Sequence, residues 1–287
     1  MEWLSLVSGF SNHTDAGLAT LVQRCPLLHP DNIRSPKKGD AFLLATATHH
    51  PELTHIDLMD AREVTDAGLA VLMTKCKKLH PNMVQSHKKG YAFLQAVALH
   101  HPDTKEISLR GCREVTDAGL ARLISGCNQL HPDKVRSDKK GDTFLAAVSK
   151  CCPDLKEINV SACKDVTDAG LAKLMKFCKD LHPDNVYSDA KGNGFVSAVS
   201  EHRRGLVQVN LTDENENNNS TDVTDAGLAE LMEKCLDMHP DSVISELKGH
   251  AFLAAVADFH PGITEIYLGG CNNVTDDGKR RYSSVRV

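Results

Sequence analysis

Apolar residues recur with two different periods in neighbouring stretches of this chain. Ile107 and Leu109 alternate with polar residues, which is the period-two pattern of a strand with one buried face. After a turn, Leu120 is followed by Leu123 and Ile124, three and four residues on, as on one face of a helix. The pattern predicts a strand, a turn and an amphipathic helix in succession.

This helix has a clear start signal, and the stretch after it repeats the same plan. Thr116 stands where an N-cap belongs, and Asp117 places a negative charge in the first turn, where the helix dipole favours it. A weaker strand follows at Val135, and a second helix carries Phe144 and Leu145. Two strand–helix units therefore follow one another.

The two units together form a repeat of fixed length. The hexapeptide TDAGLA begins at five threonines, spaced 51, 51, 51 and 57 residues apart: Thr14, Thr65, Thr116, Thr167 and Thr224. The dipeptide Lys-Gly recurs with the same spacings, at Lys38, Lys89, Lys140, Lys191 and Lys248. Repetition at a fixed period is the signature of a solenoid. We expect one solenoid domain over residues 1–287, with about eleven strand–helix units.

The one longer interval marks an insertion between a strand and its helix. Residues 213–222 are acidic, rich in Asn and without apolar side chains. Such a segment cannot bury enough surface to offset the entropy of ordering, so we expect an exposed, mobile loop. At the end of the chain, residues 279–287 form a short basic tail.

Apolar strand markers recur at alternating intervals of 23 and 28 residues until that insertion. They are Ile33, Ile56, Val84, Ile107, Val135, Ile158, Val186, Val209, Val243 and Ile266. Strands that are joined through helices run parallel, so the markers predict one curved parallel sheet with the helices outside it. At ~4.8 Å between neighbouring strands, the sheet would be roughly 50 Å long.

The repeat resembles a known family. The stretch from Leu155 to Cys178 reads L-x-x-I-x-V-x-x-C-x-x-V-T-D-A-G-L-A-x-L-x-x-x-C, which is similar to the cysteine-containing leucine-rich repeat. The second halves, with Ser137 where a leucine is expected, resemble degenerate members. The resemblance implies a ribonuclease-inhibitor-like α/β horseshoe, with the parallel sheet on its concave face and the helices on its convex face. It also implies protein recognition.

Many members of that family carry the repeats after an F-box and select substrates for ubiquitylation. No helical segment of roughly 40 residues precedes the first unit here, so we expect no F-box in this chain. The resemblance therefore leaves two hypotheses. One is a non-enzymatic interaction scaffold, as a structural or accessory subunit of a larger assembly. The alternative is the substrate-recognition subunit of a ubiquitin ligase whose adaptor-binding part lies on another chain.

Composition narrows the partner class. The chain has 33 Lys and Arg against 38 Asp and Glu, a formal net charge of −5, which disfavours a nucleic-acid binder. No apolar run reaches the ~18 residues that a membrane span needs, so we expect no membrane insertion. The first residues lack the pattern of a secretory signal. An intracellular protein is expected, cytoplasmic by default, with an organelle-associated or cytoskeletal assembly left open.

The repeat also bears on cysteine and histidine chemistry. Equivalent residues two strands apart are separated by ~10 Å, too far for a disulfide or for shared ligation of zinc. The row of equivalent histidines is His29, His80, His131, His182 and His239. Pairs such as His49-His50 would need carboxylates that converge from elsewhere. We therefore predict buried structural thiols, no metal and no cofactor.

Two recurring motifs have structural interpretations. His-Pro-Asp, as at residues 131–133, is similar to the signature of J-domain cochaperones, but here it is expected to enter a strand. Lys-Gly before each second-half helix is interpreted as a structural glycine with a solvated lysine. A nucleophile and its base must be unique residues that converge, whereas reactive side chains here are copies of one another, so no enzyme is predicted.

The outward strand positions vary while the frame stays constant, which predicts a specific binding face for a protein partner. These positions are Arg34, Asp57, Gln85, Ser108, Arg136, Asn159, Tyr187, Asn210, Ile244 and Tyr267. They are flanked by His55, Glu106, Lys134, Glu157 and Glu265. A second contact is expected at the N-terminal sheet edge near Trp3, where an uncovered edge predicts another chain or a second copy.

Overall fold

The computed structural model describes residues 13–212, 222–271 and 273–274. Within these ranges, ten α-helices of ten residues each alternate with one-turn 3-10 helices and two-residue strands. The chain divides into two compact units, Met1–Lys140 and Gly141–Val287, called unit 1 and unit 2 below. The residues expected to form the N-terminal edge, the loop at 213–221 and the basic tail lie outside the described residues.

Unit 1 contains five α-helices among the residues described there. Its elements are α1 (Asp15–Arg24), η1 (Pro30–Asn32), α2 (Asp40–His49), β1 (Ile56–Asp57), α3 (Asp66–Lys75), η2 (Pro81–Met83), β2 (Val84–Gln85), α4 (Tyr91–His100), β3 (Ile107–Ser108), α5 (Asp117–Gly126), η3 (Pro132–Lys134) and β4 (Val135–Arg136).

Unit 2 repeats the plan. Its described elements are α6 (Asp142–Cys151), β5 (Ile158–Asn159), α7 (Asp168–Phe177), η4 (Pro183–Asn185), β6 (Val186–Tyr187), α8 (Asn193–His202), β7 (Val209–Asn210), α9 (Asp225–Lys234), η5 (Pro240–Ser242), β8 (Val243–Ile244) and α10 (His250–Phe259).

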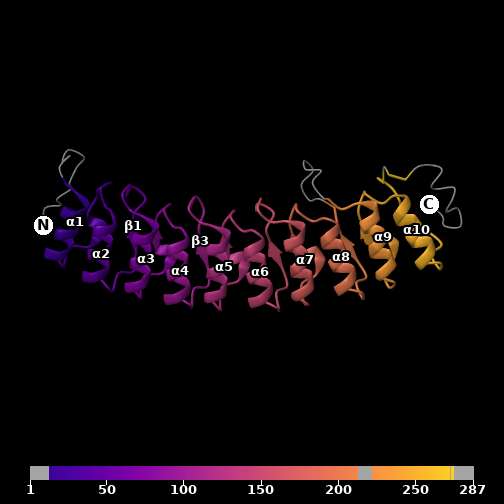
Figure 1. The fold of residues 1–287 in the computed structure, drawn as a ribbon, viewed down its shortest axis with the longest axis horizontal. Coiled ribbons are helices and arrows are strands. Elements are labelled where there is room, and N and C mark those ends of the chain that lie inside the picture. Colours follow the sequence, from indigo (N-terminus) through magenta and orange to yellow (C-terminus); the bar gives the residue numbers. More distant parts are fainter. Residues whose placement is uncertain (1–12, 213–221, 272, 275–287) are drawn as a thin grey trace. The chain divides into compact units, whose positions relative to one another are not determined.

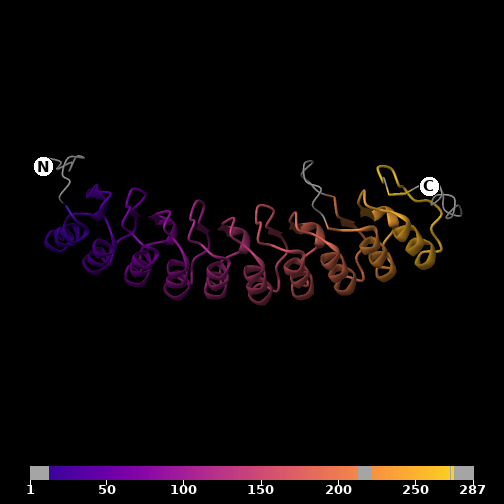
Figure 2. The ribbon, with the colours of Figure 1, turned by 45° about the horizontal axis from the view of Figure 1, so that its top comes forward.

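In each unit the helices stack side by side in chain order, with the strands and loops on the opposite side (Figures 1 and 2). The core lies between these layers. Each period contributes one fully buried phenylalanine: Phe42, Phe93, Phe144, Phe195 and Phe252. The predicted α/β architecture of repeated strand–helix units is therefore confirmed.

The strands pair differently from the continuous sheet that was expected. The described strands form four separate parallel pairs, β1 with β2, β3 with β4, β5 with β6, and β7 with β8. Ile33 and Ile266, both expected strand markers, are buried but lie outside any strand. A serine forms a turn after the second-half strand: the Ser86 hydroxyl accepts the Lys88 N–H at 3.1 Å.

His-Pro-Asp does not enter a strand as predicted. The proline begins a one-turn 3-10 helix, where its missing N–H does least harm, and the histidine is the N-cap. His29 Nδ1 accepts the Asp31 N–H at 3.2 Å, and the equivalent histidines make the same contact. The repeated histidine row is therefore a row of helix caps.

Each TDAGLA helix begins as predicted, with the threonine hydroxyl accepting the N–H of the glycine three residues on. The aspartate does more than meet its own helix dipole. Asp66, the first residue of α3, accepts the N–H groups of Gly90, Ala92 and Phe93 at 2.7, 2.7 and 2.9 Å. It therefore caps the next helix, α4, and Asp15, Asp168 and Asp225 cap α2, α8 and α10 in the same way.

The lysine of Lys-Gly is not solvated, contrary to the prediction. Lys38, Lys89 and Lys248 are each only 4% exposed, and each ammonium lies over a phenylalanine ring four residues on. Lys89 Nζ also donates to the Pro81 carbonyl at 3.2 Å. Burial lowers the pKa of all three lysines. The lysine therefore lies in the core, where its ammonium contacts an aromatic ring and, in Lys89, a backbone carbonyl.

Two of these lysines differ in their partners, which gives a testable contrast. Burial lowers the pKa of Lys38, but Asp31 and Asp57 oppose that effect, whereas at Lys89 the opposing group among the described residues is the Cys112 thiol rather than a carboxylate. We expect Lys89→Met to keep the buried stem, remove an uncompensated charge and raise the free energy of unfolding by up to about 1 kcal/mol. Lys38→Met should raise it by less, because Asp31 and Asp57 already offset part of the cost of burying its charge.

Urea denaturation of both variants at pH 7 and pH 10 tests this contrast. A lysine whose pKa is lowered on folding costs stability at neutral pH, and the cost disappears as the pH rises towards its ordinary value of 10.5. The advantage of Lys89→Met should therefore shrink at pH 10. A gain of stability for Lys38→Met as large as that for Lys89→Met would contradict the assignment.

Candidate functional site

The outward strand positions form a face in each unit, here called the strand face. In every described strand the first residue is buried and the second points outward. All of the predicted partner-binding residues lie in the described part of the chain. They are exposed except for Ser108 and Asn210, which are half-buried.

The strand face of unit 1 is polar and of mixed charge. Register places Asp57 beside Gln85, and Ser108 beside Arg136. The remaining predicted residues of this unit are Arg34, which lies outside any strand, and the flanking His55, Glu106 and Lys134. This face therefore carries three basic and two acidic side chains, with one histidine.

The strand face of unit 2 has a different character. Register places Asn159 beside Tyr187, and Asn210 beside Ile244. Tyr187, Ile244 and Tyr267 are 37%, 41% and 74% exposed, so large apolar side chains face solvent here. Glu157 and Glu265 flank them, and no basic residue belongs to this predicted set. The predicted surface of mixed charge therefore consists of two faces of different chemistry.

Side chains whose role was not predicted from the sequence link neighbouring strand pairs in each face. Asn82 Oδ1 accepts the N–H of Ser108 at 2.8 Å, and Asp31 Oδ1 accepts that of Asp57 at 2.9 Å. Asp184 and Asp241 do the same for Asn210 and Tyr267 in unit 2, at 2.6 and 2.7 Å. Each acceptor is the third residue of a His-Pro-Asp or His-Pro-Asn motif. The signal was therefore visible in the sequence, as a carboxylate or amide at one fixed place in each period.

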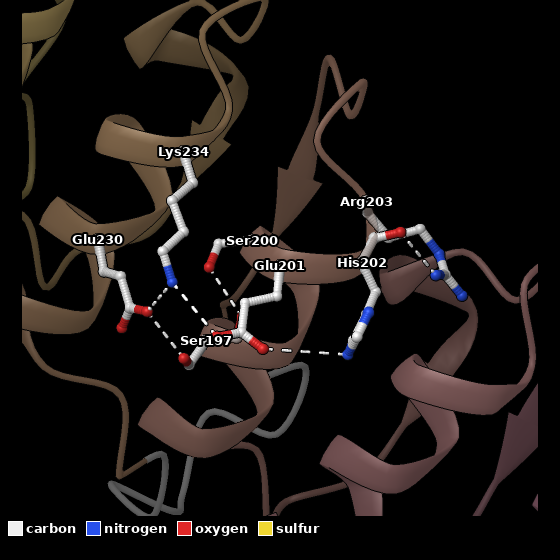
Figure 3. A network of polar contacts seen from close by, with 7 residues as sticks. All are labelled: Ser197, Ser200, Glu201, His202, Arg203, Glu230 and Lys234. Carbon is white, nitrogen blue, oxygen red and sulfur yellow. Dashed lines mark hydrogen bonds and ion pairs between the residues drawn. The ribbon is translucent and has the colours of Figure 1, made fainter.

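A polar network crosses from α8 to α9 in unit 2 (Figure 3). Glu230 Oε1 accepts hydrogen bonds from Ser197 Oγ at 2.8 Å and from Lys234 Nζ at 2.6 Å. Glu201 pairs with the same Lys234 at 3.6 Å. The hydrogen bond from Lys234 lowers the pKa of Glu230, and the same bond raises the pKa of Lys234. Because its members satisfy one another, this network serves to join the two helices rather than to bind a ligand.

The cysteines offer little thiolate chemistry. The ten cysteines all lie in the described ranges and form no disulfide there, and Cys76, Cys127, Cys178 and Cys235 are buried at the helix ends. Each of these four thiols donates to a carbonyl at the end of the preceding second-half helix, at 3.6–3.7 Å. Burial raises the pKa of these four thiols to about 11. They remain protonated at neutral pH, as expected of buried structural thiols.

Within residues 13–212, 222–271 and 273–274, no helix is long and apolar enough to cross a membrane.

Comparisons with known proteins agree with the repeat. Residues 151–175, which span β5 and most of α7, match the family model described as Leucine Rich repeat. Antagonist of mitotic exit network protein 1 of Eremothecium gossypii is 31% identical over 124 residues, 42% of this chain and 30% of that protein. F-box protein MAX2 of Arabidopsis thaliana is 26% identical over 192 residues, 61% of this chain and 28% of that protein.

The matches cover a minor part of these relatives, 30% or less of their length. Among solved structures, a chain of the Rad7 and Elc1 complex in yeast is similar over 92% of this chain and 84% of its own length. Its sequence identity is 12% and the TM-score is 0.35.

Proposed function

We propose that this chain, which is a leucine-rich-repeat protein, is a non-enzymatic scaffold that binds another protein through its strand face. The observation that carries the proposal is the contrast between constant and variable positions. Buried residues and caps are copied from period to period, whereas the outward strand residues change in size, charge and polarity. A repeat scaffold gains specificity in this way, because each unit presents one different side chain in a fixed register.

The chemistry of the face suits a protein partner. Tyrosine and arginine are the residues that most often dominate protein interfaces, and Arg136, Tyr187 and Tyr267 are exposed on strand-face positions. The charge of the face is mixed in unit 1 and acidic in unit 2, which is a poor match for a phosphate backbone. The partner is expected inside the cell, with this chain as a structural or accessory subunit of a multi-subunit complex.

A second candidate is the substrate-recognition subunit of a ubiquitin ligase. The similarity to a protein named as an F-box protein, over 61% of this chain, favours it. The two candidates differ in what binds alongside the substrate. An F-box-binding adaptor should co-purify with the chain only if the second candidate is correct.

The test compares two triple variants of the full chain. Arg136→Ala, Tyr187→Ala and Tyr267→Ala together remove the large strand-face side chains. Arg122→Ala, Tyr91→Ala and Phe177→Ala form the matched control, because they remove one exposed arginine and two exposed aromatic residues from helices α5, α4 and α7.

Affinity purification with mass spectrometry identifies the partner of the unaltered chain, and the purified partner is then titrated against each variant. The strand-face variant should bind about 100-fold more weakly, since two or three interface anchors of this kind carry much of the binding energy. The control should bind normally. Unchanged affinity in the strand-face variant, or an equal loss in the control, would overturn the assignment.

A further inference from the structure

Three side chains capable of ligating a metal lie close together in unit 1. One belongs to the residue before η1, one to η1 itself and one to the residue before β1. One ligand atom each from His29, Asp31 and His55 lies within 4.8 Å of the other two. His55 Nε2 is 3.5 Å from Asp31 Oδ2, and the rings of His29 and His55 are stacked with centroids 4.9 Å apart. His29 and Asp31 are half-buried and His55 is exposed. Among the described residues, this is the one such cluster of three or more.

The cluster exists in one period because of one residue. His29 and Asp31 belong to the repeated His-Pro-Asp motif, but His55 stands where the later periods carry Glu106, Glu157, Gln208 and Glu265. The spacing argument excluded zinc binding by equivalent histidines, which are a whole period apart. His29 and His55 are not equivalent, since they belong to consecutive strand–helix units that stack directly on one another.

Surrounding contacts orient the ligand atoms. Asp31 Oδ1 accepts the Asp57 N–H at 2.9 Å, which fixes the carboxylate and leaves Oδ2 facing His55. His55 Nδ1 lies 3.3 Å from the Thr54 hydroxyl, and donation there leaves the lone pair on Nε2, beside Asp31. His29 Nδ1 accepts the Asp31 N–H at 3.2 Å. A metal at His29 Nδ1 would replace that hydrogen bond.

We propose that His29, Asp31 and His55 bind a zinc ion. Two imidazoles and one carboxylate are a donor set that Zn²⁺ prefers, and water completes the coordination of such an open site. Ligand atoms around Zn²⁺ lie ~3.3–3.5 Å apart, so the cluster has to contract, which the exposed His55 side chain can do by rotation. The bound ion would link two consecutive strand–helix units within unit 1. Lys38 competes for Asp31, while Asp57 adds a nearby negative charge.

The test uses the full chain, freed of metal with a chelator and dialysed against buffered Zn²⁺. His55→Gln is the matched loss variant, because glutamine is the residue at the equivalent position 208. We expect one zinc fewer per chain than in the unaltered protein, or an affinity at least ~10-fold weaker. Circular dichroism checks that the variant is folded. Equal zinc binding by both proteins overturns the proposal.

A gain variant tests whether this geometry is sufficient. His239, Asp241 and Glu265 occupy the equivalent positions in the fifth period, and Asp241 is held by the Tyr267 N–H as Asp31 is held by Asp57. Glu265→His should therefore bind one additional zinc. An unchanged stoichiometry would contradict the assigned ligands. Co²⁺ substitution excludes the cysteines as the source, because a site of nitrogen and oxygen ligands shows no thiolate charge-transfer band and its spectrum should disappear in His55→Gln.

Discussion

Replacing Asp66 with alanine is expected to lower the free energy of unfolding by about 3 kcal/mol, since one carboxylate is the acceptor for three N–H groups at the start of α4. Two of these amides belong to the buried residues Gly90 and Phe93. Water reaches them poorly once the carboxylate is gone, so the lost bonds are not replaced. The effect should exceed that of an ordinary N-cap, because the acceptor is charged and comes from a different helix.

Urea denaturation followed by circular dichroism measures this loss. Asp66→Asn keeps one acceptor oxygen and should fall between the alanine variant and the unaltered chain. Asp60→Ala, an exposed residue in the turn before α3, is the control and should change stability by less than about 0.5 kcal/mol. A loss as small as that of the control would show that Asp66 does not hold the two helices together.

Much of the local structure follows from residues that act within their own strand–helix unit. Leu120, Leu123 and Ile124 are all buried in α5, on the face that the three-and-four spacing predicts. The N-cap threonines likewise act on amides three residues away, so a short stretch of sequence contains both partners. Burial of one apolar face and satisfaction of helix-end amides are local requirements, which is why the repeat predicts helix positions closely.

Contacts around the ends of each strand–helix unit, including those with the next one, were harder to predict. An isolated lysine before a helix is expected in solvent, but Lys89 is buried against Phe93 and Pro81 of its own strand–helix unit and lies near Cys112 of the next one. The aspartate of His-Pro-Asp was visible as a repeated residue, but its partner is a backbone N–H one unit away, which no side-chain pattern marks. The expectation of a continuous ladder of backbone hydrogen bonds was wrong for the same reason. Between the strand pairs, these side chains accept the backbone N–H groups instead.

The candidate site, too, was predicted in part from local sequence and in part not. Alternation predicted which strand residues point outward, because side chains in a strand alternate between faces. The separation into a charged face in unit 1 and an aromatic, acidic face in unit 2 depends on which positions each unit contains. The His29–His55 contact was missed because comparison of equivalent positions leaves out neighbours from consecutive units.

Gly68→Ala in α3 is expected to destabilise the protein by about 2–4 kcal/mol, although alanine is the better helix former by roughly 1 kcal/mol. A Cβ at this position would lie 2.1 Å from Asp40 Oδ1. Asp40 accepts both the N–H and the hydroxyl of Thr65, at 2.9 and 2.6 Å, so moving it breaks the link between α2 and α3. Gly68 is therefore required by the close approach of the preceding helix.

The repeat supplies its own control for this prediction. Gly17 is the equivalent glycine of α1, and among the described residues a Cβ there would meet only the Thr14 hydroxyl, at an ordinary 3.5 Å. Gly17→Ala should therefore stabilise the protein by about 0.5–1 kcal/mol, through helix propensity alone. Thermal and urea unfolding of the two variants should give shifts of opposite sign. Shifts of the same sign would mean that backbone preference is the reason for glycine at this position. Opposite signs would show that the reason is contact between stacked strand–helix units.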